Sequence, residues 1–153
     1  MEIVPFGVSI FSRPFWLPGA MRHDDLRSMT LASDVASIFL GRYHQVNLYE
    51  HLSKEANNLF VAGATLLFDG NKLASIEAIS LFYRSIGEVQ SEVVHCDAQL
   101  IRHTQVPYIV MSVVTRERDV RRGGQQRAYH TLVLSKVAEQ YKIKSSIIRH
   151  MPL

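Results

Sequence analysis

Residues 63–71 read Gly-Ala-Thr-Leu-Leu-Phe-Asp-Gly-Asn, and this stretch decides the fold of the chain. The apolar and β-branched residues at 64–68 predict a short strand, and the Asp-Gly-Asn at 69–71 predicts the tight turn that ends it. Ser75 then provides a helix N-cap, with Glu77 in the first turn, where an acid is favoured. A strand, a turn and a capped helix in this order indicate a domain that mixes both kinds of secondary structure.

Two further helices are predicted before this stretch. From Leu31 onward, apolar side chains recur every three or four residues, which predicts a helix with one buried stripe. The stripe comprises Val35, Ile38, Phe39, Tyr43 and Val46. Asn47 followed by Glu50 resembles a capping box and predicts the start of a second helix.

Residues 1–25 differ in composition from the rest of the chain. Aromatic residues alternate there with three prolines, and proline at this density prevents a continuous helix. We expect an apolar arm that packs onto the body, or an extension before an alternative start at Met21. A mitochondrial presequence is the weaker alternative, kept open by the scarcity of acids and by Arg13. Residues 26–153 are expected to form one domain of ordinary size.

After Gly87 the sequence predicts only strands. The segments 88–101, 107–119, 126–138 and 141–150 are rich in Val, Ile, Thr and Tyr, and turn residues separate them. The predicted fold class is therefore α+β: three N-terminal helices packed on a strongly curved, mainly antiparallel sheet in the shape of a cone. No predicted helix is left to cover the outer face of that sheet.

Composition excludes several classes of protein. With 47% apolar and 20% charged residues, the chain is neither disordered nor collagen-like. The single cysteine, Cys96, rules out an internal disulfide and favours a reducing compartment. No apolar run approaches the roughly 20 residues that a spanning helix needs. Charge is uneven: residues 101–153 hold ten Lys and Arg against three Asp and Glu, whereas residues 1–100 hold seven against eleven.

No catalytic or metal-binding group emerges from the sequence. The candidate acids and bases are Asp69, Asp97, His95, His103 and Tyr43. Asp69 is explained by its turn. His95 and Asp97 are two residues apart on one strand, so they share a face, while Val94, Cys96, Ala98 and Leu100 form the apolar face expected to point inward. The seven histidines show no metal-ligand spacing, so we expect no enzyme, no metal and no cofactor.

Several segments resemble the nuclear transport factor 2-like (NTF2-like) family. They are Gly63 to Asn71, the helical Leu81-Phe82-Tyr83, Glu92 to Asp97, Tyr129 to Ser135, and Tyr141 to Ser146. The resemblance covers roughly residues 31–150 and is closest to the small subunits of heterodimeric mRNA export receptors. The segment at 129–135 lacks one residue of the family pattern, and Ser146 stands where many members have Asp.

The resemblance implies a non-enzymatic function in nucleocytoplasmic transport. Such subunits pair through the sheet with the NTF2-like domain of a larger subunit, and the pair binds Phe-Gly nucleoporins. The implied location is the nucleus and nuclear envelope, with shuttling to the cytoplasm. The expected interface comprises His95, Asp97, Tyr129, Thr131, Val133 and Ser135. His95 replaces an Asp that the family uses in an intersubunit ion pair, so Asp97 is expected to supply the charge.

Two alternatives stay open at this stage. One is a homodimeric importer of Ran-GDP, and the other is a small-molecule enzyme or ligand binder that uses the inside of the cone. Five arginines near one hairpin turn disfavour the importer, since the family binds Ran through acidic residues: Arg116, Arg118, Arg121, Arg122 and Arg127. These arginines indicate either a solvated hairpin or a weak contact with RNA or an acidic partner.

Overall fold

The computed structural model describes residues 2–3, 8–9, 23–102 and 106–153, and most of the predicted N-terminal extension and His103 lie outside these ranges. The elements in chain order are β1 (Glu2–Ile3), β2 (Val8–Ser9), α1 (His23–Tyr43), α2 (Leu48–Leu59), β3 (Phe60–Phe68), β4 (Asn71–Leu73), α3 (Ile76–Ile86), β5 (Val89–Arg102), β6 (Tyr108–Asp119), β7 (Gln125–Val137) and β8 (Gln140–Pro152). The fold class is α+β, with three helices and a mostly antiparallel sheet. Strands β3 and β4 separate the first two helices from α3.

The second and third helices begin where the sequence predicts, whereas α1 begins at His23, eight residues before the predicted start at Leu31. Two further predictions about the helices need correction. The Ser75 side chain accepts a bond from the Ala78 N–H at 3.1 Å, which confirms this N-cap. Asn47 is the N-cap of α2 but makes no side-chain cap bond, and Glu50 instead pairs with Lys54, so the predicted capping box is wrong. The predicted stripe of α1 is also partly wrong. Ile38 is 71% exposed, whereas Ala32, Ala36, Phe39 and Tyr43 are buried.

The strands form one sheet in the order β1-β5-β6-β7-β8-β3-β4, with β2 also paired to β5. Neighbours are antiparallel except for β3 and β8, which run parallel. Two register shifts correct the predicted alternation. On β5 the shift falls between Val93 and His95, so Val94 is exposed rather than inward, while Cys96 is buried as expected. On β8 the shift spans Lys144, an extra residue that moves the inward set to Ile143, Ser146 and Ile148.

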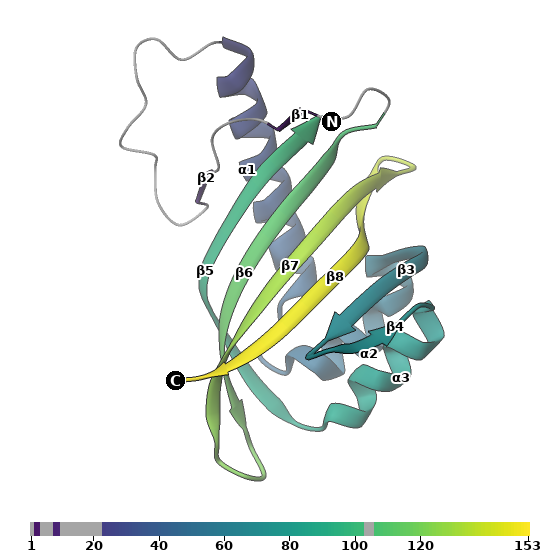
Figure 1. Cartoon of the computed structure of the whole chain (residues 1–153), viewed down its shortest axis with the longest axis vertical. Helices are drawn as coiled ribbons and strands as arrows, with labels where there is room; N and C mark the ends of the chain where they lie inside the picture. Colours follow the sequence, from purple (N-terminus) through teal and green to yellow (C-terminus); the bar gives the residue numbers. More distant parts are fainter. Residues whose placement is uncertain (1, 4–7, 10–22, 103–105) are drawn as a thin grey trace.

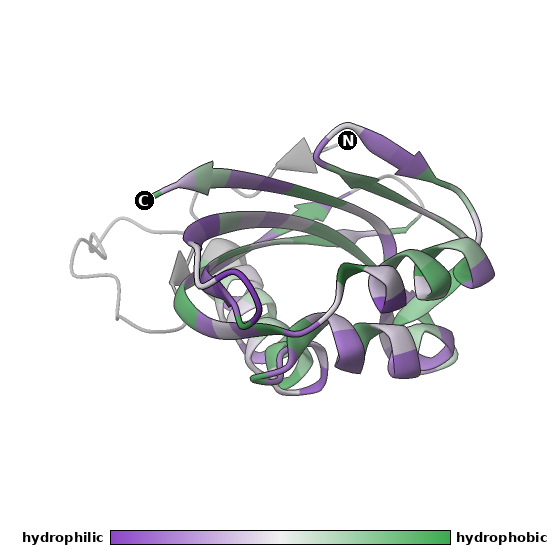
Figure 2. Ribbon diagram, turned by 90° about the horizontal axis from the view of Figure 1, so that it is seen from below, coloured by the Kyte–Doolittle hydropathy of each residue, from purple (hydrophilic) through white to green (hydrophobic). Residues whose placement is uncertain are grey.

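All three helices lie on one side of the long strands, so the molecule has two layers (Figures 1 and 2). The core fills the space between the layers. From the helices it takes Phe39, Tyr43, Tyr49 and Tyr83, all nearly inaccessible to solvent. The sheet contributes inward residues at every second position, such as Leu132 and Leu134 on β7. None of the described helices lies on the other face of β5 to β8 (Figure 2).

Candidate functional site

The outer face of the sheet, away from the helices, is formed by alternate residues of β5 to β8. Strand register aligns these residues in three rows, each read from β5 to β8. The rows are Gln99, Val110, Val133 and Ser145; Asp97, Ser112, Thr131 and Ile147; and His95, Val114, Tyr129 and Arg149. We call these twelve residues the outer face. All twelve are exposed or half-buried, whereas the residues between them on β6 and β7 are buried.

The outer face is mainly apolar on its two inner strands and charged at its margins. Val110, Val114 and Val133 are half-buried on β6 and β7, and Tyr129 is 39% exposed. The pair between them, Ser112 and Thr131, is polar. Charged groups occupy the margins: Asp97 on the β5 side and Arg149 on the β8 side. Apolar residues surrounded by a polar rim are the usual composition of a protein–protein interface.

His95 and Asp97 lie at the β5 margin and point outward, as the sequence predicts. Their side chains are about half-exposed, and His95 Nε2 lies 2.5 Å from Asp97 Oδ2. Beside Asp97 is a shallow depression of about 330 Å³ that also involves Gln99, Val110 and Ser112. Tyr129, Thr131 and Val133 share this face two strands away, and Ser135 follows them, half-buried, toward the end of β7. The predicted interface residues therefore belong to one surface.

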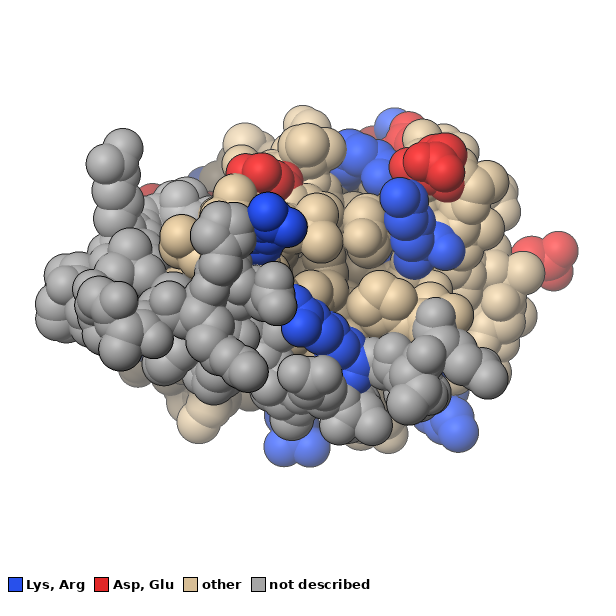
Figure 3. All heavy atoms as spheres, turned by 90° about the horizontal axis from the view of Figure 1, so that it is seen from above, with Lys and Arg blue, Asp and Glu red and all other residues tan. Residues whose placement is uncertain are grey.

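The five predicted arginines lie together around the tip of the β6–β7 hairpin, which projects beyond the rest of the sheet (Figure 1). All five are exposed. The turn is held by Asp119, whose Oδ1 accepts the backbone N–H of Arg121 at 2.9 Å and of Arg122 at 3.0 Å. These two hydrogen bonds are the main reason that the pKa of Asp119 is lowered. At the opposite end of the described surface, acidic side chains lie beside basic ones, with uncharged residues between them (Figure 3).

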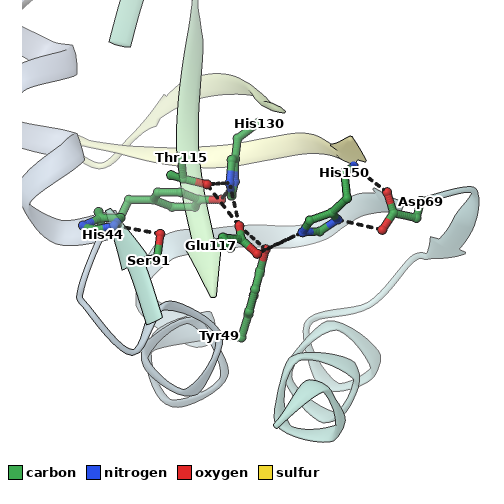
Figure 4. Close-up of polar contacts among 9 residues, drawn as sticks. His44, Tyr49, Asp69, Ser91, Thr115, Glu117, His130 and His150 are labelled. Atoms are coloured by element: carbon green, nitrogen blue, oxygen red, sulfur yellow. Dashed lines mark hydrogen bonds and ion pairs between the residues drawn. The ribbon is translucent and has the colours of Figure 1, made fainter. Parts of the chain in front are cut away.

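Between the layers lies a buried polar network that the sequence analysis missed. Its centre is Glu117 on β6, which is 2% exposed. Glu117 accepts bonds from the Tyr49 hydroxyl at 2.6 and 2.8 Å and from the Thr115 hydroxyl at 3.0 Å (Figure 4). On its other side, His150 Nε2 lies 2.9 Å from Glu117 Oε1. The sequence could have indicated that Glu117 is buried, because the alternation of β6 places it on the same inward face as Val113 and Thr115.

Two histidines extend this network in opposite directions. His150 Nδ1 lies 2.7 Å from Asp69 Oδ2, and the His150 backbone N–H donates to Asp69 Oδ1 at 2.8 Å. Asp69 thus ties the β3–β4 turn to β8, in addition to forming the predicted turn. His130 is 1% exposed and lies between the Tyr43 hydroxyl at 2.8 Å and the Thr115 hydroxyl at 3.1 Å. Both ring nitrogens of each of these two histidines therefore have a partner among the described residues.

The network shifts the pKa values of its members. Burial alone would raise the pKa of Glu117, but the His130 ring 3.6 Å away and the hydrogen bonds from His150 and Tyr49 outweigh it and lower the pKa to about 2. Burial alone would lower the pKa of His150, but the bonds and charges of Glu117 and Asp69 outweigh it and raise the pKa above 6.5. Burial also raises the pKa of Tyr49 well above its usual range. The folded state therefore favours ionised Glu117, protonated His150 and neutral Tyr49.

The raised pKa of His150 predicts a loss of stability at alkaline pH. The folded protein binds the His150 proton more tightly than the unfolded chain, so this stabilisation is complete below about pH 6.5 and disappears as the pH rises through the folded-state pKa. His44 has a lowered pKa, mainly through burial, and contributes in the opposite direction. We expect urea unfolding between pH 5.5 and 9 to show a decline that His150→Gln abolishes and His95→Gln retains. An equal decline in His150→Gln would contradict this assignment.

A small cleft reaches the network from the surface. It measures about 140 Å³ and is bordered by Tyr49, Phe68, Asp69, Glu117 and His150, among others. Pockets for drug-sized ligands are usually 300–1,000 Å³, so this cleft is small for an organic substrate. Within the described ranges, no group of three or more His, Cys, Asp or Glu is placed to hold a metal ion. Nor does any described helix have the length and apolarity to cross a membrane.

Comparison with known proteins supports the fold alone. No protein-family model matches the chain, and no curated protein matches it. Among solved structures, the yeast UBP3-associated protein BRE5 matches with a TM-score of 0.63 at 19% identity, covering 78% of this chain and 96% of that one. Nuclear transport factor 2 from Cryptosporidium parvum matches with a TM-score of 0.60 at 15% identity, covering 77% and 93%. The fold is NTF2-like.

The same fold also serves proteins of other kinds. A putative scytalone dehydratase from Novosphingobium aromaticivorans matches with a TM-score of 0.56 at 15% identity, covering 84% of this chain and 85% of that one. The NTF2-like neighbours thus include a transport factor, BRE5 and a dehydratase-like protein. At these identities the fold does not decide between binding and catalysis, so the function must be argued from the surfaces and sites of this chain.

Proposed function

We propose that the chain is a non-enzymatic transport factor, the small subunit of a heterodimeric mRNA export receptor. The observation that carries this proposal is the outer face, which is mainly apolar on its two inner strands, has charged margins and has no described helix over it. A larger subunit with its own NTF2-like domain would pack sheet to sheet on this face. The pair would then bind Phe-Gly nucleoporins and act at the nucleus and nuclear envelope, shuttling to the cytoplasm.

The geometry of the outer face supports such a pairing. Its three rows span four strands, and the three valines on its inner strands are β-branched side chains that suit packing against a second sheet. Asp97 at one margin and Arg149 at the other give the face opposite charges at its two sides. Such a pattern favours a partner that presents complementary charges and fixes its orientation.

The partner can be identified by affinity purification of the tagged full-length chain followed by mass spectrometry. We expect to recover a larger protein that contains an NTF2-like domain, together with nucleoporins. Recovery of the chain only with itself, in a dimer that binds Ran-GDP, would favour the alternative importer. Recovery of neither would contradict pairing through the outer face.

Asp97→Lys is expected to weaken the heterodimer at least tenfold, equivalent to about 1.4 kcal/mol. The change reverses the charge at the β5 margin and removes the bond to His95, but it lies at a half-exposed position where the fold tolerates it. Titration calorimetry with the purified partner measures the effect. Asp34→Lys, which makes the same change on exposed α1, is the matched control and should bind like the wild type. An unchanged Kd for Asp97→Lys would remove Asp97 from the interface.

A ligand-binding interior is the second candidate, and one observation favours it. The buried hydroxyls of Tyr83 and Ser146 have no hydrogen-bond partner among the described residues. Unpaired buried hydroxyls are uncommon and are a place where a water or a polar ligand gains affinity. Against this candidate stands the small size of the cleft that reaches the network. A ligand-binding interior requires an empty cavity between the helices and the sheet. Truncation of the buried side chain of Phe39 can test whether such a cavity exists.

A further inference from the structure

The β6–β7 hairpin concentrates positive charge that the fold does not neutralise. Arg116 on β6 lies directly opposite Arg127 on β7, and two like charges in such a cross-strand pair destabilise a sheet. None of the five hairpin arginines forms an ion pair with a described residue. Arg118 donates only to the neutral side chain of Gln90, at 2.6 Å. Within the described part of the chain, no ion pair therefore offsets the electrostatic repulsion between these arginines.

The nearby acids compensate for this charge only in part: Asp119 attracts Arg121 and Arg122 but forms no ion pair with either. The Asp119 side chain accepts the backbone N–H groups of Arg121 and Arg122 and so shapes the turn. Glu92 lies opposite Arg116 on β5, yet no ion pair joins them. Asp119 therefore holds the turn in one shape while the guanidinium groups stay exposed to solvent. A set of unpaired arginines on a preorganised turn is suited to a ligand with several negative charges.

We propose that the arginines of the β6–β7 hairpin bind the phosphate backbone of single-stranded RNA. All five cations are arginines, whose planar guanidinium groups bind phosphate through two parallel hydrogen bonds. Arg116 and Arg118 are two residues apart on one strand, about 7 Å, and Arg127 broadens the field across the next strand. RNA carries one negative phosphate at every nucleotide, so it can contact several of these spread-out arginines at once. A protein segment with one or two isolated acids could contact only some of them.

The choice of RNA over an acidic peptide rests on the proposed function in mRNA export. The presence of a cluster of exposed arginines on the hairpin does not depend on that proposal. The hairpin tip lies beyond the three rows of the outer face, because Arg116 and Arg127 form the next pair along the strands after Val114 and Tyr129. RNA can therefore occupy the tip while a partner subunit covers the rows. The two surfaces can be disabled separately by substitution.

Fluorescence anisotropy with the full-length chain and a labelled 15-nucleotide poly(U) RNA tests the proposal. Five phosphate contacts predict that affinity falls roughly 100-fold between 50 and 200 mM KCl, since the salt slope for single strands is about −0.7 per contact. Arg116→Ala/Arg127→Ala should lose at least tenfold in affinity at 50 mM KCl and show a slope smaller by about 1.4. The control Lys72→Ala/Arg84→Ala removes the same charge from exposed positions elsewhere and should bind as the wild type does.

Three results would overturn the proposal: no binding of poly(U) at 50 mM KCl, an equal loss in the control variant, or equally tight binding of a polyglutamate peptide of the same charge. The last result would assign the hairpin to an acidic protein instead. Partner capture separates this inference from the proposed function. Arg116→Ala/Arg127→Ala should still capture the larger subunit, and Asp97→Lys should still bind RNA. Failure of poly(U) binding with intact partner capture would reject the RNA site alone.

Discussion

Glu117→Ala is expected to destabilise the fold by about 3–5 kcal/mol, the usual cost of removing one partner from a buried charged pair. The substitution leaves three donors inside the protein without their acceptor: the Tyr49 hydroxyl, the Thr115 hydroxyl and His150 Nε2. It also opens a space at a position that is 2% exposed. For a domain of this size, the loss corresponds to a fall in Tm of roughly 6–20 °C.

Urea unfolding of matched variants measures this effect. Glu117→Gln keeps the shape and one acceptor oxygen, so we expect a smaller loss of about 1–3 kcal/mol. Glu92→Ala removes an exposed carboxylate from the neighbouring strand and should change stability by less than about 0.5 kcal/mol. A loss below about 1 kcal/mol for Glu117→Ala would mean that the network does not hold the two layers together. Such a result would also mean that stabilising the fold is not the main role of Glu117.

The architecture was largely predictable because the local signals agree with one another. Segments rich in Val, Ile, Thr and Tyr predicted the four long strands, and the Asp-Gly-Asn turn and the Ser75 cap predicted the order of elements around β3 and α3. The errors arose where tertiary packing overrides a local pattern. Ile38 fits the helical period of α1, but its side chain is 71% exposed, and the small residues Ala32 and Ala36 are buried instead.

The candidate site was less predictable, because its members are distant in sequence. Tyr49, Asp69, Glu117 and His150 come from α2, a turn and two strands, and only the register of the sheet brings them together. A β-bulge is likewise invisible in the alternation until pairing shows it, which is why Val94 was misplaced. The relative positions of residues on one strand were easier to predict. Thr131 and Val133 share the outer face because they are two residues apart. Whether that face binds a partner stays a prediction.

Phe39→Ala is expected to cost about 3–5 kcal/mol, the range for truncating a buried phenylalanine. Phe39 is 1% exposed and stacks on Tyr43 at a centroid distance of 6.2 Å. Tyr43 is in turn held edge-on to His130 at 5.8 Å and bonded to its Nδ1. Because Tyr43 is fixed in this way, it cannot move to fill the space that the missing ring leaves. The adjacent variant Ile38→Ala, at a 71% exposed position, is the matched control and should lie within about 0.5 kcal/mol of the wild type.

The size of this loss discriminates between a packed interior and a binding cavity. If the space under the sheet is filled, urea unfolding should show the full loss, and a small apolar ligand such as benzene should stabilise Phe39→Ala but not the wild type. If the wild-type interior is hollow, truncation should cost less than about 1 kcal/mol, and small ligands should stabilise the wild type as well. The first outcome leaves the outer face and the arginine hairpin as the functional surfaces. The second would favour a ligand binder or an enzyme, with Tyr83 and Ser146 as its first polar contacts.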